Sequence, residues 1–156
     1  MDKVYLETSF VGYLTSRPSR DLLVAAHQQI THEWWEKRRS DFELFISRIV
    51  IDESSAGDED AAQERLTLLE QLPVLQLSAE AIELAKAFVA EGVFPERASE
   101  DALHVAVAAV NGMDFLLTWN CRHIANAETV RATDAVCRAN GYEMPEICTP
   151  EELMGE

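Results

Sequence analysis

The chain has 156 residues, 47% of them hydrophobic, which is enough to build one core and excludes a largely disordered protein. Its 28 acidic and 13 basic residues give a net charge of −15, so the chain as a whole repels nucleic acids at long range. The excess of acid lies in residues 49–156, whereas residues 1–48 are balanced, so an RNA would have to bind through the basic residues of that first part or through a bound metal.

Neither a membrane span nor a signal peptide is expected. The longest apolar stretches are strand-length or are interrupted by charge, and the first twenty residues lack a basic region followed by a long apolar one. We therefore expect a cytoplasmic protein with no membrane partner. The three cysteines, Cys121, Cys137 and Cys148, form no CxxC pair and are expected to be reduced thiols.

Strand patterns alternate with helix patterns along the chain. An apolar strand at residues 3–6 runs into a polar turn that is suited to starting a helix. Beyond it the sequence predicts, in order, a helix over 21–39, a strand over 41–46, a short helix around 49–53, a helix over 58–71, a strand over 73–77, a helix over 78–91, a buried helix over 99–111, a strand over 115–118, a helix over 127–140 and a last strand around 146–148. On the helix over 21–39, we expect the face with Leu22, Ala26, Ile30 and Trp34 to pack inward.

This alternation, with short connections, predicts a three-layer α/β/α fold around a central parallel sheet of about five strands. We expect a single domain that spans residues 1–156, because no linker or internal repeat interrupts the chain. In such sheets, ligands bind beyond the carboxyl ends of the strands, where the chain turns into the next helix.

Four residues able to bind a metal are expected at that edge of the sheet. Glu7 and Asn120 follow two apolar strands, Glu53 lies on the helix after the second strand, and Asp101 lies in the first turn of a buried helix. Carboxylates gathered from distant positions repel one another and resist losing water, so a fold that gathers them most often holds a divalent cation. The sequence therefore predicts a metal site.

Each of these residues also has a purely structural interpretation. Glu7 and Asp101 are placed where acids favour the start of a helix, whether or not a metal binds. His104, one helical turn after Asp101, is interpreted as a structural histidine that is able to bond that carboxylate. His123 and its neighbour Arg122 fit a phosphate contact and a solvated loop equally well.

The segments that carry these residues resemble the PIN-domain family, and within it the VapC-like ribonuclease toxins of type II toxin–antitoxin pairs. The matching segments are residues 3–9, 51–57, 100–106 and 117–123. The resemblance implies a PIN-like α/β/α domain and a metal-dependent ribonuclease whose acidic cluster holds Mg²⁺ or Mn²⁺. It assigns the first three acidic positions to Glu7, Glu53 and Asp101, and the fourth to Asn120. It also implies an RNA substrate, a cognate antitoxin partner and a homodimer.

Two positions depart from the family pattern. Glu7 stands where aspartate is usual, and Asn120 replaces a carboxylate by a neutral amide. We therefore expect weaker metal binding, with a single metal where the family can hold two.

The hydroxyls of Thr8, Ser9 and Thr118 are expected to orient metal-bound water or a phosphate oxygen, and Arg122 to contact the substrate. The alternative function is a catalytically weakened PIN-fold module that acts by binding a protein partner. A phosphatase of the dehalogenase class ranks last, because residues 3–9 contain no DxD motif.

Overall fold

Five parallel strands form a central sheet in the computed structural model, which describes residues 1–156. They lie in the order β3-β2-β1-β4-β5, and their bounds are β1 (Lys3–Leu6), β2 (Glu43–Ser47), β3 (Val74–Leu75), β4 (Phe115–Leu117) and β5 (Glu146–Cys148). In the register, Tyr5 of β1 lies opposite Phe45 of β2 and Leu116 of β4. The predicted parallel sheet of about five strands is confirmed.

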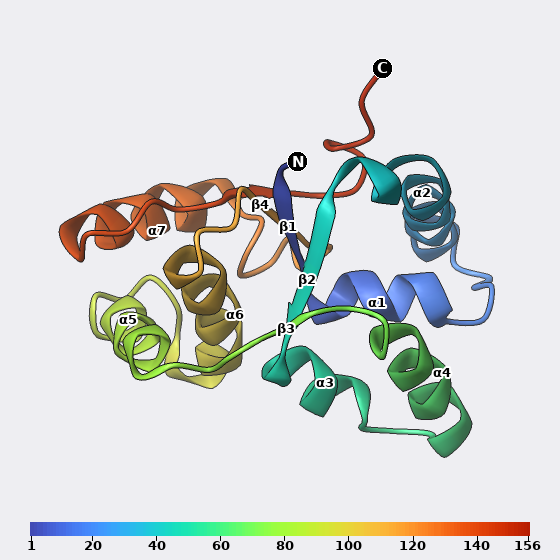
Figure 1. Ribbon diagram of the computed structural model, residues 1–156, viewed down its shortest axis with the longest axis horizontal. Helices are drawn as coiled ribbons and strands as arrows, with labels where there is room; N and C mark the ends of the chain where they lie inside the picture. Colours follow the sequence, from blue (N-terminus) through green and yellow to red (C-terminus); the bar gives the residue numbers. More distant parts are fainter.

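Seven α-helices cover the two faces of this sheet. They are α1 (Thr8–Thr15), α2 (Leu22–Arg38), α3 (Arg48–Ser54), α4 (Glu59–Leu69), α5 (Ala79–Ala90), α6 (Ser99–Val110) and α7 (Ala127–Ala139), with short 3₁₀ turns at Arg39–Asp41 and Glu96–Ala98. Figure 1 shows α1 to α4 on one side of the strands and α5 to α7 on the other. The predicted three-layer α/β/α fold is therefore confirmed.

The order of the strands creates a switch point between β1 and β4. From β1 the chain moves outward to β2 and β3, then crosses back over the sheet to β4 and β5 on the other side of β1. Helices that follow β1 and β4 therefore leave toward opposite faces of the sheet, and in sheets of this kind ligands bind at the carboxyl ends of the strands that flank such a point.

Local sequence signals explain most of the helix boundaries. Side chains at the first position outside the helix accept a backbone N–H at the starts of α1, α2, α4, α5 and α7, from Glu7, Asp21, Asp58, Ser78 and Asn126. Helix α6 ends at a turn in which Gly112 has a φ of +67° and the Met113 N–H donates to the Ala108 carbonyl. That left-handed backbone is the reason glycine suits this position.

Helix α6 lies in the core, as its apolar sequence predicts. Seven of its twelve residues are buried: Ala102, His104, Val105, Ala106, Val107, Ala108 and Ala109. They pack in one cluster with β1 and β4, which are themselves buried. A buried histidine in this otherwise apolar set requires hydrogen-bond partners for both ring nitrogens.

The predicted inward face of α2 is wrong at its first turns. Leu22 is 88% exposed, and the buried residues of α2 are Gln28, Thr31 and Trp34. The Gln28 amide donates to the Ser16 hydroxyl and the Arg17 carbonyl, and it accepts from the backbone N–H of Ser19. The buried amide provides hydrogen-bond partners for the polar groups of the loop before α2, and this orientation of the helix leaves Leu22 in solvent. A hydrophobic pattern alone does not reveal such hydrogen bonds.

No helix combines the length and the apolar character that a membrane span requires. All three cysteines are free thiols, with Cys137 and Cys148 buried and Cys121 exposed.

Candidate metal centre

The candidate site lies at the carboxyl ends of β1 and β4, at the switch point of the sheet. Glu7 follows β1 directly, and its backbone N–H donates to the Leu117 carbonyl at the end of β4. Thr118 follows β4 in the same way. This joins the first turn of α1 to the segment after β4.

Glu7 is buried, with 5% of its surface exposed, and its carboxylate accepts three hydrogen bonds. Its Oε1 accepts from the hydroxyls of Ser9 and Thr118, each at 2.5 Å, and its Oε2 accepts from the Ser9 backbone N–H at 3.2 Å. Glu7 therefore caps α1, as its structural interpretation predicts. The longer side chain of glutamate meets Thr118, which directly follows the neighbouring strand β4.

Glu53 on α3 forms the second half of the site. Its Oε1 accepts from the Thr8 hydroxyl at 2.5 Å and from Nε2 of His104 at 2.6 Å. Burial raises the pKa of Glu53, but the hydrogen bond and charge of His104, together with the Thr8 hydroxyl, lower it to about 2. Glu53 is therefore an anion at neutral pH.

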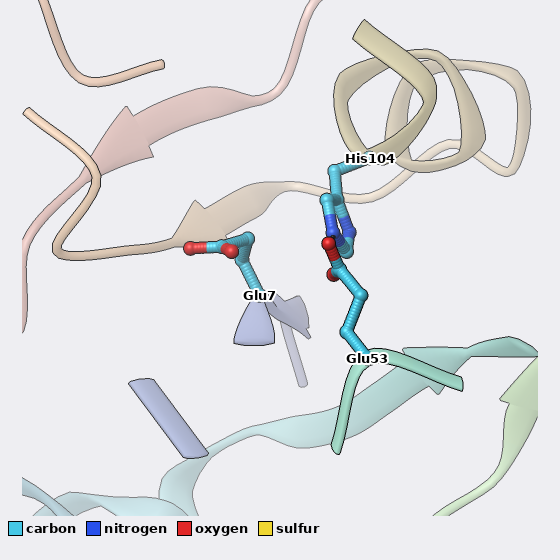
Figure 2. Close-up of side chains that lie close together, drawn as sticks. All are labelled: Glu7, Glu53 and His104. Atoms are coloured by element: carbon cyan, nitrogen blue, oxygen red, sulfur yellow. Dashed lines mark hydrogen bonds and ion pairs between the residues drawn. The ribbon is translucent and has the colours of Figure 1, made fainter. Parts of the chain in front are cut away.

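These side chains come close enough to share one ion. Ligand atoms of Glu7, Glu53 and His104 all lie within 4.8 Å of one another. Figure 2 shows Glu53 and His104 meeting end to end, with Glu7 beside them and its carboxylate turned away from the pair. Two carboxylates supply the hard oxygen ligands that Mg²⁺ and Mn²⁺ prefer, so the donor set fits such an ion.

Asp101 and Asn120 stand next to this group but outside it. Asp101 lies one turn before His104 on α6, and its Oδ2 is 3.0 Å from Nδ1 of His123. The Asn120 Oδ1 accepts from the His123 backbone N–H at 3.0 Å. Of the four sequence-predicted ligands, the structure brings Glu7 and Glu53 together, while Asp101 and Asn120 converge on His123.

His104 is a buried structural histidine, as interpreted from the sequence, but its carboxylate partner is not Asp101. His104 bonds Glu53 rather than Asp101, because its ring points into the core and is fully buried, whereas Asp101 is partly exposed and turns toward His123. The sequence holds one signal for this arrangement: Tyr5 of β1 lies two residues before Glu7, and residues two apart along an extended chain share a face, so a polar group was to be expected close to the acidic cluster.

Glu100 is a further acid that sequence reasoning left out of the site. A hydrogen bond to Glu53 and the negative charge of Glu53 raise the pKa of Glu100. Its carboxyl group therefore lies against that of Glu53, although Glu100 itself is exposed. The sequence signal that could have placed Glu100 beside the site is its position next to Asp101 at the start of α6.

The polar residues predicted to contact substrate divide into two groups. Thr8, Ser9 and Thr118 direct their hydroxyls to Glu53 or Glu7, so they hold the acids in place. Arg122 is exposed and forms no ion pair, so its guanidinium is free to meet a ligand.

The low pKa of Glu53 predicts an acid-sensitive contribution to stability. The folded value of about 2 lies below the ordinary value of 4.5, so the unfolded chain binds this proton more readily. The contribution is complete above pH 4.5 and is lost as the pH falls toward 2. We expect urea unfolding of the metal-free protein to show this loss, and the Glu53→Gln variant to lack it. Parallel pH profiles for the two proteins would contradict the expectation.

Comparison with known proteins places the chain in a family. The sequence model of the PIN domain matches residues 4–129, so the chain belongs to the PIN domain family, as its motifs suggest. No curated protein sequence matches it.

Two solved structures share its fold. VapC20 of Mycobacterium tuberculosis, a toxin that cleaves the sarcin–ricin loop, matches with a TM-score of 0.62 at 17% identity, over 78% of this chain and 93% of its own. VapBC2 of Rickettsia felis, solved bound to a DNA fragment from its promoter, matches with a TM-score of 0.58 at 16% identity, over 94% of this chain and 98% of its own. At such identities, the likeness concerns the fold.

Proposed function

We propose that this protein is a metal-dependent ribonuclease and the toxin of a toxin–antitoxin pair. The observation that carries the proposal is the pair of buried or half-buried carboxylates, Glu7 and Glu53, gathered at the switch point of a PIN fold. An acidic cluster in this position has no basic partner apart from His104, so a divalent cation is the natural counter-charge.

Mg²⁺ or Mn²⁺ is the proposed cofactor. Glu7 and Glu53 would hold it directly, with Asp101 and Asn120 at the edge of the same site. When bound, such an ion lowers the pKa of a water molecule and polarises a phosphoryl oxygen, which is what phosphodiester hydrolysis needs. Since Asn120 is neutral and its oxygen is engaged by His123, we propose a single metal.

The chain's own residues orient the acids and receive the substrate. Thr8 holds Glu53, while Ser9 and Thr118 hold Glu7, so both carboxylates are set before an RNA arrives. Arg17 and Arg20 lie exposed before α2 and form no ion pair, in contrast to Lys37 and Arg39, which pair with acids of α2. We propose that these free arginines, with Arg122, contact the phosphate backbone.

The solved relatives support the biological role. VapC20 is a toxin that cleaves RNA, and VapBC2 was solved bound to DNA from its promoter. We propose that this chain likewise works in the cytoplasm as a single PIN-like domain, bound by a cognate antitoxin and paired as a homodimer.

RNA cleavage in the presence of Mg²⁺ or Mn²⁺ tests this function. We expect the native protein to cleave RNA, a chelator to abolish the cleavage, and added Mn²⁺ to restore it. Asp101→Asn should lower the rate about 10- to 100-fold, because it removes a charge beside the metal ligands. Asp134→Asn is the matched control, since Asp134 pairs with Arg138 on the exposed side of α7. Equal rates for the native protein and Asp101→Asn would overturn this assignment.

A binding module without catalysis is the second candidate. The observation that favours it is that Asp101 and Asn120 both bond His123 and stand apart from the Glu7 and Glu53 pair. Calorimetry separates the two candidates: no heat of Mn²⁺ binding at millimolar metal, together with tight binding of a protein partner, would favour the module.

A further inference from the structure

Glu53 is connected to the interior by a continuous chain of hydrogen bonds. The Ser47 hydroxyl lies 2.7 Å from the Tyr5 hydroxyl, which lies 2.7 Å from Nδ1 of His104. Nε2 of His104 then meets Oε1 of Glu53 at 2.6 Å. Ser47 ends β2 and Tyr5 lies in β1, so the chain runs from the middle of the sheet to the edge of the candidate metal site.

The chemistry of the groups fixes the direction of one of these hydrogen bonds. The Glu53 carboxylate only accepts, so Nε2 of His104 carries a proton and donates to it. Nδ1 meets the Tyr5 hydroxyl, which donates to a neutral ring or accepts from a protonated one, and the same hydroxyl meets that of Ser47.

Both donors to Glu53 fall on the same oxygen. The Thr8 hydroxyl and Nε2 of His104 both donate to Oε1, and the exposed Glu100 carboxyl is a further neighbour of the same carboxylate. A glutamate side chain otherwise samples several rotamers, and two donors on one oxygen select a single orientation. That orientation fixes where Oε2 would meet a cation.

We infer that His104, held by Tyr5, is a positioning residue that orients Glu53 for metal binding, rather than a metal ligand itself. The inference rests on the proposed metal site. Both nitrogens of the fully buried ring already have partners in the protein, so ligation by His104 would break one of these bonds. A histidine that donates to a carboxylate ligand is the counterpart of the carboxylate that commonly orients a ligating histidine.

Two amide substitutions of His104 distinguish the roles of its two ring nitrogens. Gln places its amide nitrogen near the position of Nε2 and keeps a donor to Glu53, whereas the shorter Asn reaches only the position of Nδ1. Titration calorimetry with Mn²⁺ should show the dissociation constant raised about 10- to 100-fold for His104→Asn, and changed less than about threefold for His104→Gln. Urea unfolding of both metal-free variants checks that each one folds.

Tyr5→Phe is the second variant, for the case that His104→Asn does not fold. It keeps the ring in the core and removes only the hydroxyl that holds Nδ1. We expect Mn²⁺ affinity to fall about three- to tenfold, which corresponds to one neutral hydrogen bond.

Electron spin echo measurements on bound Mn²⁺ should reveal no directly coordinated nitrogen. A directly coordinated nitrogen, or Mn²⁺ affinity that is unchanged in His104→Asn and Tyr5→Phe, would overturn the inference, as would equal losses in the Asn and Gln variants. If the native protein itself binds no Mn²⁺, the proposed function fails first, so the two failures are distinguishable.

Discussion

Glu53→Gln is expected to lower metal-dependent RNA cleavage about 10³-fold while the protein stays folded. The amide keeps an oxygen to accept from Thr8 and His104, so the local hydrogen bonds survive. Its nitrogen takes the place of Oε2, carries no negative charge and cannot bind a cation. A metal ion stabilises the charge of the transition state by several kcal/mol, and losing a ligand that holds the ion corresponds to about this factor in rate. Single-turnover cleavage with saturating Mn²⁺ measures it.

Asp52→Asn is the control for this experiment. Asp52 is the next residue on α3, but it is exposed and pairs with Arg48 at 3.3 Å. Its replacement removes the same charge from the same helix, and we expect cleavage to change less than about twofold, since exposed ion pairs contribute little. Equal losses in the two variants would mean that overall charge, and not the site, governs the rate.

Trp34→Ala is expected to lower the free energy of unfolding by about 3–5 kcal/mol, the usual range for removing a large aromatic side chain from a core. Trp34 is fully buried, stacks on Phe42 and meets Phe10 edge-on. Its indole N–H also donates to the Leu153 carbonyl, which ties the end of the chain to α2. Urea unfolding of the metal-free protein measures the loss.

The neighbouring tryptophan provides the matched comparison. Trp35 is only partly buried, and the Arg39 guanidinium lies over its ring. Trp35→Ala should therefore cost less than about 2 kcal/mol, because less apolar surface returns to water. A greater loss from Trp35→Ala than from Trp34→Ala would contradict the burial on which both predictions depend. Since Thr31 on the same helix accepts from the indole N–H of Trp119, a loosened α2 should also disturb the loop that carries Asn120.

The layers of the fold were readable from the sequence because they depend on local patterns. Alternation of apolar strands and helical segments predicts the parallel sheet, and the continuous apolar run of α6 predicts a buried helix. The prediction for the inward face of α2 was wrong, because the hydrogen bonds of the buried Gln28 to the preceding loop outweigh the cost of exposing Leu22. Such a compensation involves hydrogen bonds between the helix and the loop before it, and it leaves no hydrophobic pattern.

The site was readable only in part. The positions of Glu7 and Glu53 relative to their strands place both acids at one edge of the sheet, and family motifs name the same residues. What the motifs do not contain is the direction of each side chain. Asp101 turns to His123, and His104 turns to Glu53, although the two lie one helical turn apart on α6.

The sequence by itself determined the class of this protein: a parallel α/β fold, membership of the PIN domain family, and acids at the carboxyl ends of its strands. Only the tertiary structure decided which polar groups hold those acids. Tyr5, Ser47, Glu53 and His104 come from four different elements, and their hydrogen bonds form because buried polar atoms must find partners in whatever packing surrounds them. That requirement acts across the assembled core, so it is not visible in any one segment.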